Sequence, residues 1–149
     1  MTVLTTLTPF RVPDAAAVEK ACFTQPWSER SLRDELNSPC ANNFCVTVDG
    51  KFAGYGGFLA VADAGEITRI AGLPEFRRLG LGRMIMEAMV SRAREKELAT
   101  MFLEVRESNI PAISLYECFG FEKVGRRPNY YEMPTEAAVL MSADLQAKE

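Results

Sequence analysis

The sequence predicts an α+β domain in which a mixed, mostly antiparallel and twisted sheet is flanked by helices. Two observations carry this prediction. Asp49 and Gly50 form a tight-turn signal between two apolar runs, which is typical of an antiparallel hairpin. After Pro74 the apolar residues follow helical spacing, and strand-like and helix-like segments then alternate. The expected order is strand, helix, helix, three strands, helix, strand, helix and two strands.

The first part of the chain is predicted to form one strand and two helices. Alternating residues indicate a strand over Leu4–Phe10. Pro13 suits the first turn of a helix whose apolar stripe runs from Ala15 to Cys22. Ser28 is a favoured N-cap residue, so a second short helix is expected to start there.

A three-stranded meander is expected next, with strands over residues 44–48, 52–61 and 66–72 and a turn at Gly65. The glycines of its second strand predict bulges or a close approach of another segment.

The remaining elements complete the sheet. Residues 81–92 form a helix, residues 101–105 a strand and residues 139–145 a last strand. Asn109 is expected to cap another helix, and Gly120 to end it in a left-handed conformation.

Composition limits the function. The 149 residues are expected to form a single domain, 1–149, with 48% hydrophobic residues and a net charge of −3. The chain has no histidine, so Ser-His-Asp and Cys-His mechanisms are excluded within it. Its four cysteines are scattered and predict no metal site. We expect a soluble, cytoplasmic protein that binds neither nucleic acid nor a membrane.

The most specific motif is Arg77-Arg78-Leu79-Gly80-Leu81-Gly82-Arg83, which lies between a predicted strand and a predicted helix. Its glycines allow a tight turn, and the free N–H groups of a helix start favour an anion such as a pyrophosphate. On its own, the motif favours the simpler interpretation, a glycine-containing loop with solvated arginines.

In its context, this motif resembles the acetyl-CoA motif of the GNAT acetyltransferases, and residues 103–109 and 112–121 resemble that family's second block. The resemblance implies the GNAT fold, acetyl-CoA as co-substrate and transfer to an amine within a ternary complex. It implies three groups of cofactor-binding residues: Ile70, Ala71 and Gly72 of the strand, Arg77, Arg78, Leu79, Gly80, Leu81, Gly82 and Arg83 of the turn, and Asn109.

Within that family, Pro26-Trp27-Ser28-Glu29, Leu103-Glu104-Val105-Arg106 and Asn129-Tyr130-Tyr131 resemble the ribosomal-protein-alanine N-acetyltransferases (RimI). The resemblance implies that the acceptor is the N-terminal alanine of a small-subunit ribosomal protein. Gly72, Pro128 and Glu136 depart from the usual pattern, which leaves the cofactor strand and the peptide-side loop as places of possible difference.

The same resemblance assigns two catalytic residues. Glu104 is the candidate base for the amine, and Tyr116 is the candidate acid for the departing thiolate. Their simpler interpretations are a solvent-facing strand glutamate and a core tyrosine. Tyr130 and Tyr131 are candidate acceptor-binding residues, although paired aromatics also serve ordinary packing.

Two other functions stay open from the sequence. One is acetylation of a small amine such as a polyamine, an aminoglycoside or an amino acid. The other is an acyl-CoA-binding protein without catalysis, against which the presence of Glu104 and Tyr116 argues.

Overall fold

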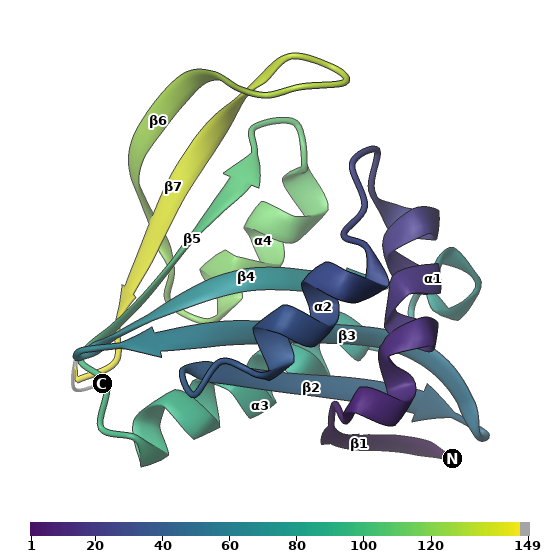
Figure 1. The fold of residues 1–149 in the computed structure, drawn as a ribbon. Coiled ribbons are helices and arrows are strands. Elements are labelled where there is room, and N and C mark those ends of the chain that lie inside the picture. The colour runs from purple at the N-terminus through teal and green to yellow at the C-terminus, as the bar shows by residue number, and fades with distance from the viewer. Residues whose placement is uncertain (147–149) are drawn as a thin grey trace.

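The computed structural model describes residues 1–146, and its helices and strands follow the predicted order (Figure 1). The strands are β1 (Thr2–Thr6), β2 (Ala41–Val48), β3 (Lys51–Val61), β4 (Ala64–Gly72), β5 (Thr100–Arg106), β6 (Glu122–Tyr131) and β7 (Glu136–Asp144). The helices are α1 (Val12–Cys22), α2 (Glu29–Leu36), α3 (Leu81–Glu95) and α4 (Ile110–Cys118), with short 3-10 turns at Pro9–Arg11 and Pro74–Phe76. No helix within residues 1–146 is long and apolar enough to span a bilayer.

The predicted helix boundaries are confirmed at three capping positions. The Ser28 side chain accepts a hydrogen bond from the Ser31 N–H at 3.1 Å, which starts α2. The Asn109 side chain accepts from the Ala112 N–H at 3.3 Å, which starts α4. Gly120 has a φ of 88°, the left-handed conformation expected after the end of α4.

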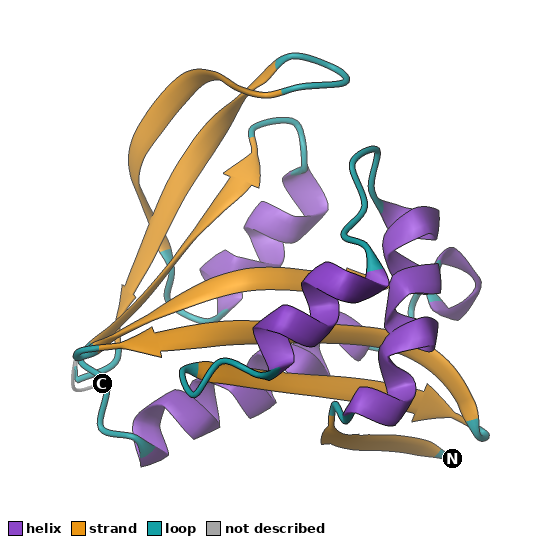
Figure 2. Ribbon diagram, in the orientation of Figure 1, coloured by secondary structure: helices purple, strands orange, loops and turns teal. Residues whose placement is uncertain are grey.

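The seven strands form one sheet in the order β1-β2-β3-β4-β5-β7-β6, with helices on both faces (Figure 2). Strand alternation divides the core between these faces. In β2, Phe44 and Val46 belong to the larger cluster, which packs against α3 and α4. Cys45 points the other way, into the cluster formed with α1 and α2.

Two local expectations were wrong. The first strand ends at Thr6, earlier than the predicted Phe10, because Pro9 has no N–H for the ladder and starts a 3-10 turn instead. Gly65 does not turn the chain. It lies within β4, opposite Ala60, and the turn is made at Ala62, whose φ is 55°.

The feature that shapes the molecule is the pairing of β4 with β5. These strands are parallel and pair only from Ala64 to Glu66 and from Thr100 to Phe102. Each then follows its own antiparallel neighbour, β4 along β3 and β5 along β7. The two strands therefore diverge, as Figure 1 shows, and within residues 1–146 the edge of β4 that faces β5 has no strand partner beyond Glu66.

The predicted close approach in β3 is confirmed at Gly54. A Cβ at this position would lie 2.6 Å from the Ala71 carbonyl oxygen and 3.1 Å from the Gly72 Cα. Both are backbone atoms of β4, so neither can rotate away. The bulges also occur, with register shifts between Val46 and Thr47 and between Gly57 and Phe58.

Replacing Gly54 by alanine should therefore destabilise the protein. We expect Gly54→Ala to lower the free energy of unfolding by about 1–3 kcal/mol, the usual cost of forcing extra volume into a packed site. Gly125→Ala on β6 is the matched control, because its nearest contact would be 3.8 Å and its cost should stay within about 0.5 kcal/mol. Urea denaturation measures both, and equal midpoints would contradict the prediction.

Candidate active site

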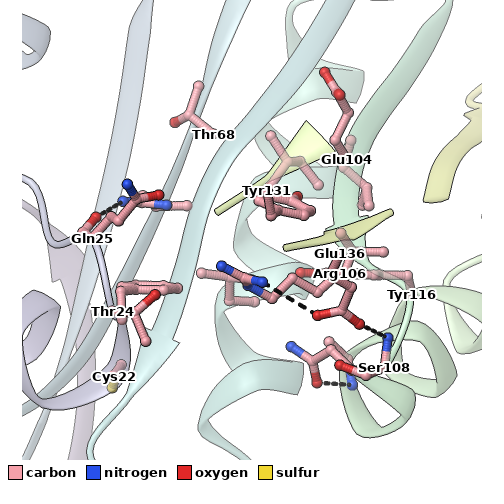
Figure 3. A pocket seen from close by; sticks show the side chains of 18 of the residues that line it. Cys22, Thr24, Gln25, Thr68, Glu104, Arg106, Ser108, Tyr116, Tyr131 and Glu136 are labelled. Atoms are coloured by element: carbon pink, nitrogen blue, oxygen red, sulfur yellow. Dashed lines mark hydrogen bonds and ion pairs between the residues drawn. The ribbon is translucent and has the colours of Figure 1, made fainter. Parts of the chain in front are cut away.

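A cleft of about 680 Å³ occupies the space between the diverging strands. Its floor is formed by residues 67–70 of β4 and 103–106 of β5. The segment between α1 and α2 lines one side, and α4 together with Tyr131, Pro134 and Glu136 lines the other. Figure 3 shows Thr24 and Gln25 on one side of this opening and Arg106 and Tyr131 on the other.

Glu104 enters the cleft from β5. Its side chain is 22% exposed, and Arg127 Nε lies 3.9 Å from its Oε2 atom. This oxygen is buried and accepts no hydrogen bond from any residue within 1–146. Buried carboxylate oxygens normally have a hydrogen-bond partner. The Oε2 atom therefore has Arg127 as its charged neighbour but no hydrogen-bond donor within residues 1–146, and Glu104 borders the cleft through the exposed part of its side chain.

Tyr116 reaches the same cleft from α4. The residue is 5% exposed, and its ring packs against Phe121 with 6.1 Å between the centroids. Burial is the main reason that the pKa of Tyr116 lies above its ordinary value. Its hydroxyl consequently stays protonated at neutral pH and can act as a hydrogen-bond donor.

Tyr130 and Tyr131 of β6 differ in their places. Tyr131 lines the cleft, whereas Tyr130 is 46% exposed. The two rings pack edge-to-face, with 5.0 Å between their centroids. Burial, with a contribution from the Glu104 carboxylate, raises the pKa of Tyr131 to about 12. The same two causes raise the pKa of Tyr130.

The predicted cofactor residues form a path that leaves the cleft. Ile70 lines the cleft, Ala71 is buried, and the Gly72 carbonyl accepts a hydrogen bond from the Cys22 thiol at 3.3 Å. A Cβ at Gly72 would lie 3.8 Å from Leu81 Cδ1, so the end of β4 adjoins the start of α3.

The Gly-rich turn lies at that helix start and is not part of the cleft lining. Gly80 is the N-cap of α3 with a φ of 74°, and Arg78 has a φ of 67°. A Cβ at Gly82 would lie 2.9 Å from Leu115 Cδ2, so glycine permits close packing of α3 on α4. Arg83 stacks on Phe119 at 5.7 Å. Asn109 lines the cleft as well as capping α4.

Two arginines of the site were not predicted. Arg106 lies two residues after Glu104, so the period of a strand could have indicated that both face the same side. It donates to the Glu132 and Pro134 carbonyls at 2.8 and 2.9 Å and stacks over Tyr131 at 4.6 Å. Arg69 also lines the cleft, and no local signal in the sequence could have identified it.

The three departures from the family pattern lie at structurally distinct places. Gly72 has room for a larger side chain, since nothing would lie nearer than 3.8 Å to its Cβ. Pro128 lies where β6 loses register with β7, a position that tolerates a missing N–H. Glu136 accepts from the Ser108 N–H at 2.6 Å and pairs with Arg106, and hydrogen bonding to Ser108 is the main reason that its pKa is lowered.

Comparison with known proteins identifies this architecture. The model of the acetyltransferase (GNAT) family matches residues 12–121. The chain belongs to this family. GNAT enzymes use acetyl-CoA, and the chain is accordingly an acyltransferase.

Individual relatives narrow the comparison. An Escherichia coli protein named [ribosomal protein bS18]-alanine N-acetyltransferase is 34% identical over 146 residues, 95% of this chain and 97% of that one. A Bacillus subtilis protein, whose name gives the same activity provisionally, is 40% identical over 125 residues, 83% of each chain. A crystal structure of the ribosomal-protein-S18-alanine N-acetyltransferase from Escherichia coli matches with a TM-score of 0.92 and 32% identity, covering 100% of this chain and 97% of the other.

The environment of the tyrosines predicts a specific pH dependence. All four tyrosines of the chain, Tyr55, Tyr116, Tyr130 and Tyr131, have a raised pKa in the folded protein, with burial as the largest cause. At pH 10 the tyrosines of the unfolded chain should be about half ionised, and the folded protein should show a smaller phenolate absorbance.

The same shifts fix the sign of the effect on stability. Folding favours the neutral phenols, so their contribution is fully present below about pH 10 and is lost as the pH rises through the folded-state values. Ultraviolet titration of folded and urea-unfolded protein measures the difference. Equal phenolate fractions in the two states at pH 10 would contradict it, and Tyr131→Phe should weaken the pH dependence of stability.

Proposed function

We propose that the protein transfers the acetyl group of acetyl-CoA to the N-terminal alanine of ribosomal protein bS18, directly and within a ternary complex. In this proposal the chain acts as one catalytic domain and needs no metal. The observation that carries the proposal is that Glu104 and Tyr116 line the same cleft, from β5 and α4. The names of relatives that match nearly the full chain supply the acceptor.

The cofactor follows the path from the cleft to the turn. The edge of β4 that lacks a strand partner, at Ile70, Ala71 and Gly72, can hydrogen-bond the amide groups of the pantetheine arm as a neighbouring strand would. The pyrophosphate then reaches the N-terminus of α3, where free N–H groups and the helix dipole favour an anion.

In this proposal the turn supplies both the backbone and the charge for the pyrophosphate. Its cofactor-binding residues are Arg77, Arg78, Leu79, Gly80, Leu81, Gly82 and Arg83. Asn109 extends the contact from the start of α4, on the cleft side.

The acceptor amine must be neutral before it can attack. An α-amine has a reference pKa of about 7.7–8.0, so about a tenth of it is free base at pH 7. The carboxylate of Glu104, which lines the cleft, can accept the proton that the nitrogen loses as the N–C bond forms, directly or through a water molecule. Tyr131 and Tyr130 contact the first residues of the acceptor on the side of the cleft next to Glu104.

The opposite end of the reaction needs a proton for the sulfur. When the C–S bond breaks, the Tyr116 hydroxyl donates its proton to the departing thiolate and then regains one from solvent. Its raised pKa keeps this proton available throughout the neutral range.

Direct transfer is supported by the state of the cysteine in the cleft. Burial is the main reason that the pKa of Cys22 is raised, and the nearby Glu19 carboxylate raises it further. A thiol held in its neutral form is a poor nucleophile, which argues against an acetyl-cysteine intermediate at this position.

The acceptor is tested by thiol release from acetyl-CoA with a panel of amines. Peptides with a free N-terminal alanine should be acetylated, because at pH 7 a far larger fraction of their α-amine than of a lysine side chain is deprotonated. The matched controls are the same peptides with a blocked N-terminus and an internal lysine, which should react poorly. A preference for spermidine or for the internal lysine would refute the ribosomal-protein acceptor and leave the family assignment intact.

The two proton-transfer roles predict different pH profiles. Tyr116→Phe should lower kcat by a factor on the order of 10²–10⁴, with acetyl-CoA affinity little changed. Its defect should persist to about pH 9.5, because Tyr116 remains protonated there. Glu104→Gln should be less impaired as the pH rises through the α-amine pKa, since more amine arrives deprotonated. Rates of both variants near that of the wild type would place the acid and the base elsewhere.

A further inference from the structure

Arg69 makes contacts that no catalytic role of the cleft requires. Its guanidinium lies over two aromatic rings, 4.3 Å from the centroid of Phe23 and 4.4 Å from that of Trp27. It also donates to Glu19 Oε1 at 3.1 Å and to the Gln25 carbonyl at 3.4 Å. A planar guanidinium can stack and donate in this way at the same time, which a lysine ammonium cannot do.

Glu19 anchors this cluster to the body of the protein. The residue is on α1 and is fully buried. Besides Arg69, it accepts hydrogen bonds from the Trp27 N–H at 2.8 Å and from the Tyr55 hydroxyl of β3. A buried carboxylate is stable only when it is paired and hydrogen-bonded, so these groups hold one another in place.

The segment between α1 and α2 depends on these two residues. Residues 24–27 belong to no helix or strand. In the part of the chain that the structure describes, their hydrogen bonds run only to Arg69 and Glu19. Phe23, Gln25 and Trp27 line the cleft. Figure 3 shows Gln25 across the opening from Arg106 and Tyr131, so the position of this segment sets one wall of the cleft.

We infer that Arg69 is a positioning residue: it fixes the segment of residues 23–27 as one wall of the acceptor cleft and thereby sets the affinity for the acceptor. This inference rests on the proposed function, in that it takes the cleft to be the acceptor site. Arg69 itself exchanges no proton with either substrate. Its effect should therefore fall on the KM for the acceptor and leave both kcat and the KM for acetyl-CoA nearly unchanged.

The test uses Arg69→Lys, which keeps the positive charge beside Glu19 but loses the planar guanidinium that stacks on the aromatic rings. Phe23→Leu is a second variant that removes one of the two rings and leaves the ion pair whole. The matched control is Arg33→Lys on α2. Among the described residues, Arg33 contacts Glu29 at 3.6 Å and the Pro9 carbonyl, both in exposed positions. Thermal melting establishes that each variant is folded.

Two readouts are measured on each protein. Trp27 is the chain's single tryptophan, so acrylamide quenching of its fluorescence measures how accessible residue 27 of the wall is to solvent, and no substrate is needed. We expect stronger quenching in Arg69→Lys and Phe23→Leu and no change in Arg33→Lys. The KM for the acceptor should rise about tenfold in Arg69→Lys, which corresponds to about 1.4 kcal/mol of binding free energy.

The outcomes separate the two proposals. Unchanged quenching in both variants would overturn the role of Arg69 in holding the wall. Stronger quenching with an unchanged acceptor KM would overturn its role in acceptor affinity. If the wild type prefers spermidine to peptides, the proposed acceptor is wrong, and the same two measurements made with spermidine still decide the role of Arg69.

Discussion

The short parallel pairing of β4 with β5 is the constraint on which the rest of this molecule depends. Each strand is bound along its length to a different antiparallel partner, β4 to β3 and β5 to β7, and they share only the pairs from Ala64 to Glu66. The divergence that follows creates the cleft and leaves one edge of β4 without a strand partner. It also directs Glu104 into the opening, so the proposed base, the cofactor edge and the acceptor walls all result from one local loss of pairing.

The order of helices and strands was predictable because its signals are local. Caps such as Ser28 and Asn109 act within one helical turn, and a hairpin signal such as Asp49-Gly50 acts within two residues. The divergence of β4 from β5 was not predictable, since it depends on which distant strand each one pairs with. The turn at Ala62 was missed because alanine rarely adopts a positive φ, and nothing in its neighbours indicates one.

The candidate site shows the same division between local and distant information. The family motifs indicated Glu104 and Tyr116, and the structure brings both to one cleft, while their catalytic roles stay predictions. Arg69 escaped notice because its partner Glu19 lies on the first helix, far away in sequence. Each diverging strand thus carries one arginine that hydrogen-bonds the backbone of a connecting segment. Arg69 bonds the α1–α2 segment, and Arg106 bonds the β6–β7 turn.

The three-pair contact between β4 and β5 has a mechanical consequence. These three pairs are the only direct connection between the two strands within residues 1–146, and Arg69 lies three residues beyond Glu66, or about 10 Å along the strand. A small rotation of one strand about these three pairs would therefore displace Arg69 or Arg106 by a larger distance, because both arginines lie farther along the strands. Gly65 lies within these three pairs, and a Cβ at this position would press against Leu98, Phe58 and Met101. The packing around Gly65 therefore bears on the width of the cleft from a place that is not part of the cleft lining.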